Sequence, residues 1–246
     1  MRSVSFTSKP ASRLRWYTRR LRSMSVPEVA WRSAQQGRRV LPRSTVSDSS
    51  AARLLSADSD WGSALEAFRR GNDRPVLLDR ARARSIADSS PQVVEKLVRA
   101  AERVAAGRVT YFGYPEVQLG EPIDWNYDPL HLFRWPGKAG ARIDHRVAAA
   151  DPKWIWELNR LQHLPWLAQA WLFTSRDEFA ETALNQLDSW IEQNPVGQGM
   201  AWRGAYEPAM RAISVVIAIQ GIRDSPALTV SRFERVVRLK ASAGNK

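Results

Sequence analysis

The 246-residue chain contains no cysteine, which excludes disulfides and thiolate metal sites. It has no run of about 18 apolar residues, so no transmembrane segment is predicted. The basic N-terminus is not followed by an apolar stretch, so no signal peptide is visible and a cytoplasmic location is the default expectation. No glycine-rich phosphate loop or Gly-x-Ser-x-Gly elbow occurs, which disfavours nucleotide enzymes and serine hydrolases. His131, His145 and His163 lack ligand spacing, so we expect neither a metal nor a nucleotide cofactor.

Positive charge is abundant but concentrated at the front of the chain. The net charge is +12, and residues 1–55 hold 12 Lys and Arg against two acidic residues, Glu28 and Asp48. We therefore divide the chain into a basic arm with a first helix, 1–55, and a body, 56–246. The arm could contact nucleic acid, acidic lipid or an anionic glycan, or it could be a solvated basic segment.

Helical periodicity and capping signals predict an all-α fold made of antiparallel helical hairpins. Ser25-Val-Pro-Glu28 begins a helix that should end near Gly37, and a short basic helix is expected before it. Residues 75–80 could form a brief strand or an extended segment. Further helices are predicted at 61–69, 91–107, 152–173, 176–193, 204–221 and from 231. Residues 41–52 read as a polar linker, and residues 108–150 as a long loop, which in a compact domain is usually functional.

Tryptophan is unusually frequent between residues 125 and 202, and its role depends on context. Trp166, Trp171 and Trp190 lie at helical spacing among Leu and Ala, which favours packing in the core. Trp125 and Trp135 lie in the polar loop, where contact with a ligand is about as plausible as burial. Aromatic faces pack well against the C–H faces of sugar rings, so a glycan is a reasonable ligand for this region.

One polar stripe is predicted on the helix over 152–173. Trp156, Asn159, Arg160 and His163 have the spacing of a single helical face. Amide, guanidinium and imidazole groups together suit carboxylate or sulfate binding. The alternative is an ordinary solvated face. Pro165 should bend or loosen the helix just beyond the stripe.

A glycine-rich turn, Gly197-Gln-Gly199, precedes the helix over 204–221. Glu207 and Arg211 on that helix are four residues apart, and this spacing alone predicts a surface ion pair. The backbone N–H groups at the start of the helix could also bind an anion.

Several ordered motifs together resemble the heparinase II/III family of polysaccharide lyases. The most specific is Trp156-Glu-Leu-Asn-Arg-Leu-Gln-His163, which is similar to the family's Trp-Glu-Leu-Asn-Arg-x-Gln-His run. The loop from Gly120 to Arg146, the stretch Asp188-Ser-Trp-Ile-Glu-Gln-Asn-Pro195 and the front segment Arg20–Arg32 also match. The resemblance covers most of residues 13 to about 222.

The resemblance implies an incomplete (α/α) toroid followed by a β-sandwich, in an enzyme that cleaves uronic-acid polysaccharides by β-elimination without a cofactor. A base removes the proton α to the uronate carboxylate, a donor neutralises that carboxylate, and an acid protonates the leaving oxygen. In the family the neutralising Asn follows the Gly-x-Gly turn, but here Ala201 occupies that position. The family's catalytic Tyr and His lie further along than Lys246.

We therefore expect the N-terminal portion of such a lyase, truncated before the β-sandwich and inactive alone, with an acidic polysaccharide as partner. The alternative is a non-catalytic helical module that binds anionic glycan, lipid or nucleic acid through its basic N-terminal arm. Six residues are expected to line an anionic-glycan cleft: Asn159, Arg160, His163, Trp202, Glu207 and Arg211.

Overall fold

The computed structural model describes residues 18, 20, 22–40, 60–71, 79–146, 148 and 150–244. Contacts divide the chain into two units, residues 1–43 and residues 44–246, and each is described by itself. No helix in the described ranges is both long and apolar enough to cross a membrane. The division of the chain at residue 55 stays a prediction.

The first unit contains helix α2 (Val26–Val40). The Ser25 hydroxyl accepts a hydrogen bond of 3.4 Å from the backbone N–H of Glu28, as the capping signal predicted. The predicted end at Gly37 is wrong, because the helix continues to Val40. The basic helix expected over 13–23 falls largely outside the described residues, although residues 18, 20 and 22 are helical, and the linker over 41–52 lies outside them.

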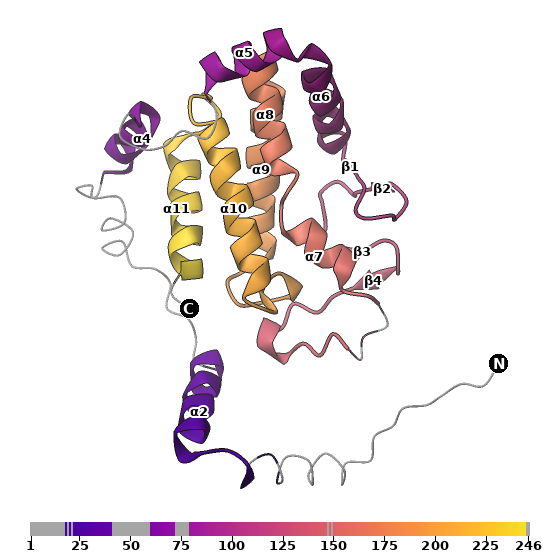
Figure 1. Cartoon of the computed structure of the whole chain (residues 1–246), viewed down its shortest axis with the longest axis vertical. Helices are drawn as coiled ribbons and strands as arrows, with labels where there is room; N and C mark the ends of the chain where they lie inside the picture. Colours follow the sequence, from indigo (N-terminus) through magenta and orange to yellow (C-terminus); the bar gives the residue numbers. More distant parts are fainter. Residues whose placement is uncertain are drawn as a thin grey trace, which may run out of the picture. The chain divides into compact units, whose positions relative to one another are not determined.

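The second unit is built from helices, which confirms the all-α prediction (Figure 1). In chain order these are α4 (Trp61–Arg70), α5 (Arg80–Ser89), α6 (Pro91–Ala105), α7 (Lys153–Asn159), α8 (Leu164–Thr174), α9 (Asp177–Gln193), α10 (Tyr206–Gly221) and α11 (Val230–Gly244). Helix α5 was not predicted, and most of the strand expected at 75–80 lies outside the described residues.

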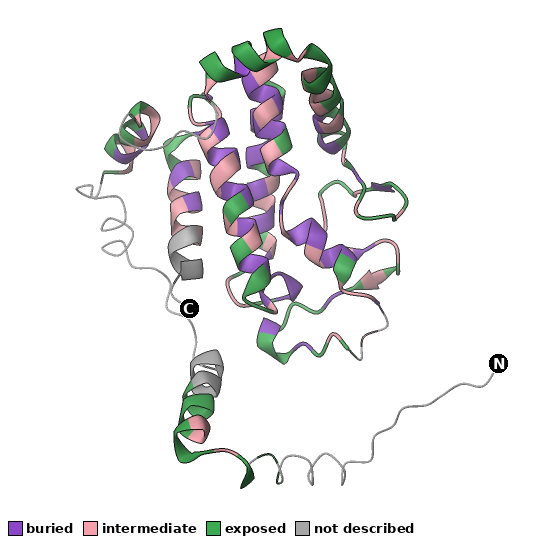
Figure 2. Cartoon of the chain, in the orientation of Figure 1, coloured by how far each residue is buried: buried purple, intermediate pink, exposed green. Residues whose placement is uncertain are grey.

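Helix α8 occupies the centre of the second unit and contacts α6, α9 and α10. Its residues are apolar on almost every face, and Figure 2 shows it largely buried. Leu164, Leu167 and Trp171 are at most 1% exposed. An apolar helix surrounded by three others gives the unit a continuous core, against which the connecting segments pack.

The predicted loop over 108–150 is more ordered than expected. Two short antiparallel pairs form within it, β1 (Arg108–Val109) with β2 (Val117–Gln118) and β3 (Tyr127–Asp128) with β4 (Phe133–Arg134). The 3-10 helix η1 (Gly140–Arg142) follows.

The burial of the tryptophans differs in part from the prediction. Trp171 and Trp190 are fully buried, as expected. Trp125 and Trp135 are also buried, because the loop folds back on α9 and the Trp125 indole donates a hydrogen bond of 3.2 Å to the Ser189 hydroxyl. Trp166 was expected in the core but is 44% exposed, so this prediction was wrong.

Candidate functional site

The polar stripe predicted on one long helix does not exist as such. Helix α7 ends at Asn159, a turn follows, and α8 begins at Leu164. Leu161 adopts a left-handed conformation with φ of 55°, which a continuous helix does not allow. The break lies before Pro165 rather than at it. It directs Asn159, Arg160 and His163 into three different environments.

Asn159 lies in the interior and its side-chain amide is engaged there. Its Nδ2 donates to the carbonyl oxygens of Trp125 at 2.9 Å and Ile155 at 2.8 Å. Its Oδ1 accepts a hydrogen bond of 2.8 Å from the Trp190 indole. The residue therefore fastens the 125 loop and α9 to α7, and a direct contact with a ligand would require breaking these bonds.

Arg160 forms the centre of an ion-pair cluster. Its Nε and Nη2 donate to the two carboxylate oxygens of Glu207 at 2.8 and 3.1 Å, and its Nη1 pairs with Glu157. The Tyr206 ring lies over the guanidinium, with 5.1 Å from Cζ to the ring centroid. Glu207 is only 6% exposed, so the surface ion pair predicted between Glu207 and Arg211 is wrong.

Arg211 is buried between two tryptophans. Its Cζ lies 4.2 Å from the Trp190 ring centroid and 4.6 Å from that of Trp202. Nη1 donates to the carbonyl oxygen of Asn159 at 3.0 Å, and Nη2 to that of Ala201 at 3.2 Å. Burial lowers the pKa of Arg211 to about 9, and the nearby Glu207 carboxylate opposes part of that shift.

Ala201 and Trp202 belong to the 3-10 helix η2 (Met200–Trp202), which leads into α10. Gly199 enters this turn with φ of 70°, a conformation that favours glycine. The Trp202 indole donates a hydrogen bond of 3.0 Å to the carbonyl oxygen of Asn194. Ala201 is fully buried and has a methyl group where the resemblance places a neutralising Asn, so position 201 offers no side-chain donor.

The loop at residues 138–143 fixes this turn from the other side. Gly140 N donates to the carbonyl oxygen of Gly197 at 2.7 Å, and Gly199 N to that of Lys138 at 2.9 Å. A Cβ atom at position 140 would lie 2.8 Å from the carbonyl oxygens of both Gly199 and Trp202. Glycine at position 140 therefore lets the two backbones approach.

His163 is separated from this ion-pair cluster and stacks on Trp125, with ring centroids 6.1 Å apart and an angle of 9° between the planes. Burial lowers the pKa of His163 to about 4, and the Gln186 side chain opposes that shift in part. The imidazole is therefore neutral at pH 7. Its Nδ1 is buried without a hydrogen-bond partner in the described structure.

Of the six predicted residues, Asn159, Arg211 and Trp202 form one cluster with η2, and Arg160 and Glu207 form a neighbouring ion pair whose carboxylate interacts electrostatically with Arg211. His163 lies apart from both. Glu157 and Tyr206 were not predicted as site residues. Glu157 is three residues before Arg160 on a helix, which is a signal for a pair, but Tyr206 meets Arg160 only through the tertiary fold. No cluster of potential metal ligands occurs among the described residues.

The helical unit matches a known protein family. The family model described as heparinase II/III N-terminus matches residues 63–239, which include most of α4, all of α5 to α10 with η2, and most of α11. The chain belongs to the heparinase II/III family. The recognised family region thus contains the whole Arg160 network, and the resemblance inferred from the Trp-Glu-Leu-Asn-Arg run is confirmed.

One solved structure is similar to this heparinase II/III chain: a mutant of the heparan sulfate lyase HepC from Pedobacter heparinus. The identity is 17% and the TM-score is 0.47, with 79% of this chain and 26% of that chain covered. The chain thus spans about a quarter of the length of that lyase. No curated protein matches it significantly.

Proposed function

We propose that this chain is the N-terminal helical portion of a polysaccharide lyase that binds a uronic-acid-containing glycan at the start of α10. We further propose that it does not carry out β-elimination by itself. Family membership supports the glycan as ligand. The buried Ala201 supports the absence of catalysis, because a missing oxyanion donor of this kind costs about 3 kcal/mol of transition-state stabilisation.

The arrangement of Arg160 is the observation that carries the binding proposal. Glu157 and Glu207 hold the guanidinium from two sides, yet each terminal nitrogen carries a second hydrogen that no bond to the described residues uses. The Arg160 side chain is 16% exposed, so these hydrogens can reach a ligand carboxylate. Tyr206 is 61% exposed and can support the apolar face of a sugar ring.

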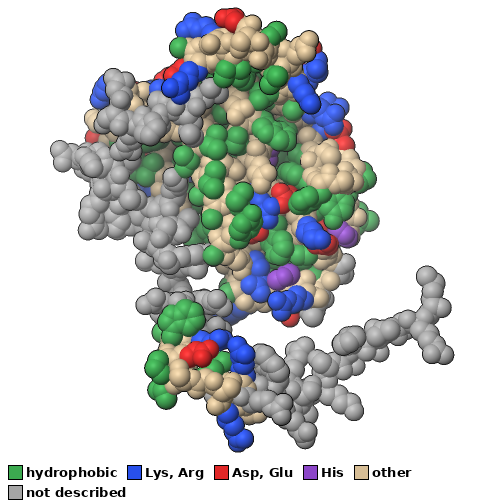
Figure 3. Space-filling view, viewed as in Figure 1, with side chains coloured by type: hydrophobic (Ala, Val, Ile, Leu, Met, Phe, Trp, Pro, Cys, Tyr) green, Lys and Arg blue, Asp and Glu red, His purple; other side chains and the backbone are tan. Residues whose placement is uncertain are grey.

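The other predicted residues have positioning roles in this proposal. Arg211 and Asn159 connect α10, α7 and η2, and Trp202 packs on Arg211. Figure 3 shows acidic and basic side chains close together near the middle of one face, surrounded by hydrophobic groups. A rigid, nearly charge-balanced cluster of this kind selects an anionic sugar by geometry rather than by strong net attraction.

The test combines an activity assay and a binding assay on the full chain. No unsaturated uronate absorbance should appear with any polysaccharide in a panel of uronic-acid glycans, and its appearance would refute the inactive state. Titration with a uronate oligosaccharide should show binding that Arg160→Gln weakens about tenfold, corresponding to loss of one charge-assisted contact. Equal affinity of Arg160→Gln and the wild type would refute the site.

The charge of the front segment favours a second candidate, binding of an acidic partner through residues 1–55. Twelve Lys and Arg against two acidic residues create a strongly positive segment. Deleting residues 1–24 distinguishes the two candidates. If the deletion alone abolishes glycan binding, the basic arm is the binding element. If binding survives the deletion and is lost in Arg160→Gln, the binding element is the site at the start of α10.

A further inference from the structure

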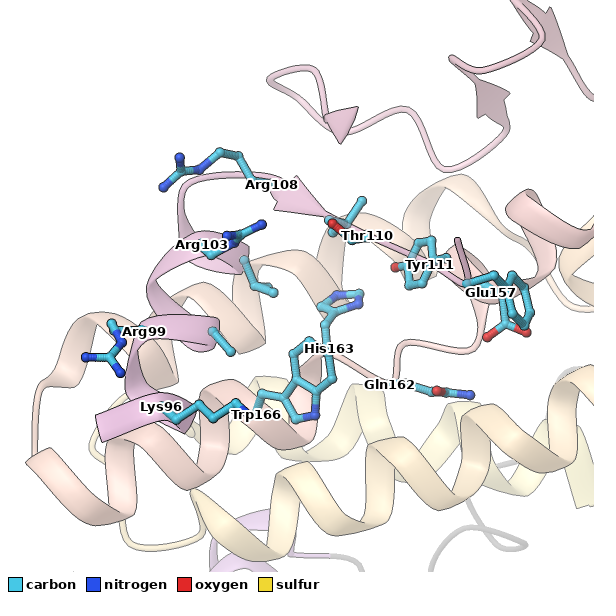
Figure 4. A pocket seen from close by; sticks show the side chains of 14 residues that line it. Lys96, Arg99, Arg103, Arg108, Thr110, Tyr111, Glu157, Gln162, His163 and Trp166 are labelled. Carbon is cyan, nitrogen blue, oxygen red and sulfur yellow. The ribbon is translucent and has the colours of Figure 1, made fainter. Parts of the chain in front are cut away.

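A concave surface lies between α6, the segment after it and the start of α8 (Figure 4). It is a groove with a volume of about 620 Å³. Gly107, with φ of 73°, turns the chain out of α6 into β1, and the pairing of Arg108 with Gln118 fixes the following residues along the groove. Neither Arg160 nor Glu207 is among the residues that line it.

Basic side chains border one side of this groove. Figure 4 shows Lys96, Arg99, Arg103 and Arg108 in a row along α6 and into β1. Arg99 and Arg103 form ion pairs with Glu95 and Glu116. Within the described part of the chain, the side chains of Lys96 and Arg108 form no ion pair or hydrogen bond, and both residues are exposed.

The acidic charge in the groove is partly compensated. Glu157 is the acidic residue that lines it, and its carboxylate pairs with Arg160, which also pairs with Glu207. Lys96 and Arg108 therefore give the groove an uncompensated positive charge of the kind that binds carboxylate or sulfate groups.

Two buried polar groups in the wall of the groove lack partners. The Nδ1 atom of His163 and the hydroxyl of Tyr111 are buried without a hydrogen bond in the described structure. His163 is only 3% exposed overall, and its ring lies in the centre of the groove in Figure 4. Unsatisfied buried polar groups are costly, so a ligand that bonds to them gains affinity.

Two aromatic side chains complete the groove. Trp166 is 44% exposed and Phe112 is 66% exposed, and both line it. Large exposed aromatic rings beside neutral hydrogen-bonding groups are the combination that fits a sugar ring, whose C–H face is apolar and whose edge carries hydroxyls.

We propose that this groove is a second binding site for an anionic oligosaccharide, separate from the Arg160 site. Lys96 and Arg108 bind sulfate or carboxylate groups, Trp166 stacks on a sugar ring, and His163 and Tyr111 bond to hydroxyls. The choice of a saccharide rests on the function proposed above. A small inorganic anion would use the cations alone and leave the aromatic rings and most of the 620 Å³ without contacts.

The test is a calorimetric titration of the full chain, which measures its affinity for a sulfated uronate hexasaccharide, the desulfated form and a neutral hexasaccharide. The groove variant is Lys96→Gln with Arg108→Gln. The matched control, Arg70→Gln with Arg84→Gln, removes the same charge from exposed arginines on α4 and α5. A second pair compares Trp166→Ala with Leu132→Ala, where Leu132 is 79% exposed in the turn between β3 and β4.

The groove variant and Trp166→Ala should each weaken binding of the sulfated hexasaccharide by about tenfold, and their controls by less than about twofold. The neutral sugar should bind more weakly than either charged one. Loss of affinity in Arg160→Gln alone, with the groove variant unchanged, would overturn the groove and leave the proposed function standing. Absence of binding in the wild type would overturn both.

The same variants distinguish other polyanions. Tighter binding of a single-stranded RNA or an anionic phospholipid vesicle than of the hexasaccharide, lost in the groove variant, would overturn the saccharide assignment. An equal loss of affinity for sulfate ion and for the hexasaccharide in the groove variant, with no effect of Trp166→Ala, would also overturn the saccharide assignment.

Discussion

The guanidinium of Arg211 on α10 donates a hydrogen bond of 3.0 Å to the carbonyl oxygen of Asn159, the last residue of α7. The same side chain bonds to the carbonyl of Ala201 and lies between two indole rings. The end of one helix, a 3-10 turn and a second helix are thus joined by one buried cation.

Replacing Arg211 with Met should lower the free energy of unfolding by about 3 kcal/mol, because two buried carbonyl groups lose their donor. Urea unfolding followed by circular dichroism measures the change. Arg84→Met, at an exposed position on α5, is the control and should change stability by less than about 0.5 kcal/mol. Equal stability of the two variants would show that Arg211 does not hold the network together.

The two hydrogen bonds between Arg160 and Glu207 should make the effects of mutating the two residues on the free energy of unfolding non-additive. A double-mutant cycle with Arg160→Met and Glu207→Gln should give about 1–2 kcal/mol of interaction in the free energy of unfolding. The pair is largely buried, at 16% and 8% side-chain exposure, so solvent screens it less than a surface pair. A coupling energy indistinguishable from that of the exposed pair Arg32–Glu28 would contradict the structure.

His163 should make stability depend on pH. Its pKa is lowered to about 4 in the folded protein, from about 6.5 when unfolded. As pH falls below 6.5 the unfolded chain binds a proton that the folded protein does not, so stability decreases from pH 6.5 toward pH 4, by up to about 3 kcal/mol. Above 6.5 both states are neutral at this residue, and the effect is absent.

Comparing His163→Phe with the wild type isolates this contribution, because phenylalanine keeps a ring against Trp125 without titrating. The difference in unfolding free energy between the two proteins should change between pH 7 and pH 5. His145→Gln should show a change of the same sign, because burial and the nearby Arg203 also lower the pKa of His145. A constant difference for His163→Phe across this range would mean that the imidazole is solvated.

Gly140→Ala should destabilise the protein by about 2 kcal/mol, since the added methyl group meets two backbone carbonyl oxygens that cannot rotate away. Gly137→Ala is the matched control, because a Cβ at that position has nothing within 4 Å. Thermal melts of both variants provide the measurement. A melting temperature of Gly140→Ala at or above that of Gly137→Ala would show that the loop and η2 are not in contact.

Much of the helical fold could be predicted from the sequence, because capping residues and apolar spacing act locally. The predicted helices at 61–69, 91–107, 176–193 and 204–221 agree with the structure within a few residues at each end. The break between α7 and α8 was missed, since a left-handed Leu161 is fixed by packing on both sides and has no local sequence signal.

The site was predicted in composition but not in arrangement. Helical spacing paired Glu207 with Arg211, whereas the fold pairs Glu207 with Arg160, which is 47 residues away. The cost of burying a guanidinium is offset by carbonyl groups and indole rings from distant segments, and single-chain spacing contains no information about them. The exposure of Trp166 was missed for the same reason.

The unequal burial of the tryptophans gives the protein its own optical reporter. Trp125, Trp135, Trp154, Trp171 and Trp190 are at most 1% exposed and will emit as indoles in an apolar medium. Trp166 is the tryptophan of α8 that meets solvent, at 44% exposure, and it does so inside the groove. Because Trp31 is also exposed, at 62%, the part of the quenchable intrinsic fluorescence that Trp166→Phe removes will report occupancy of the groove, with no label attached.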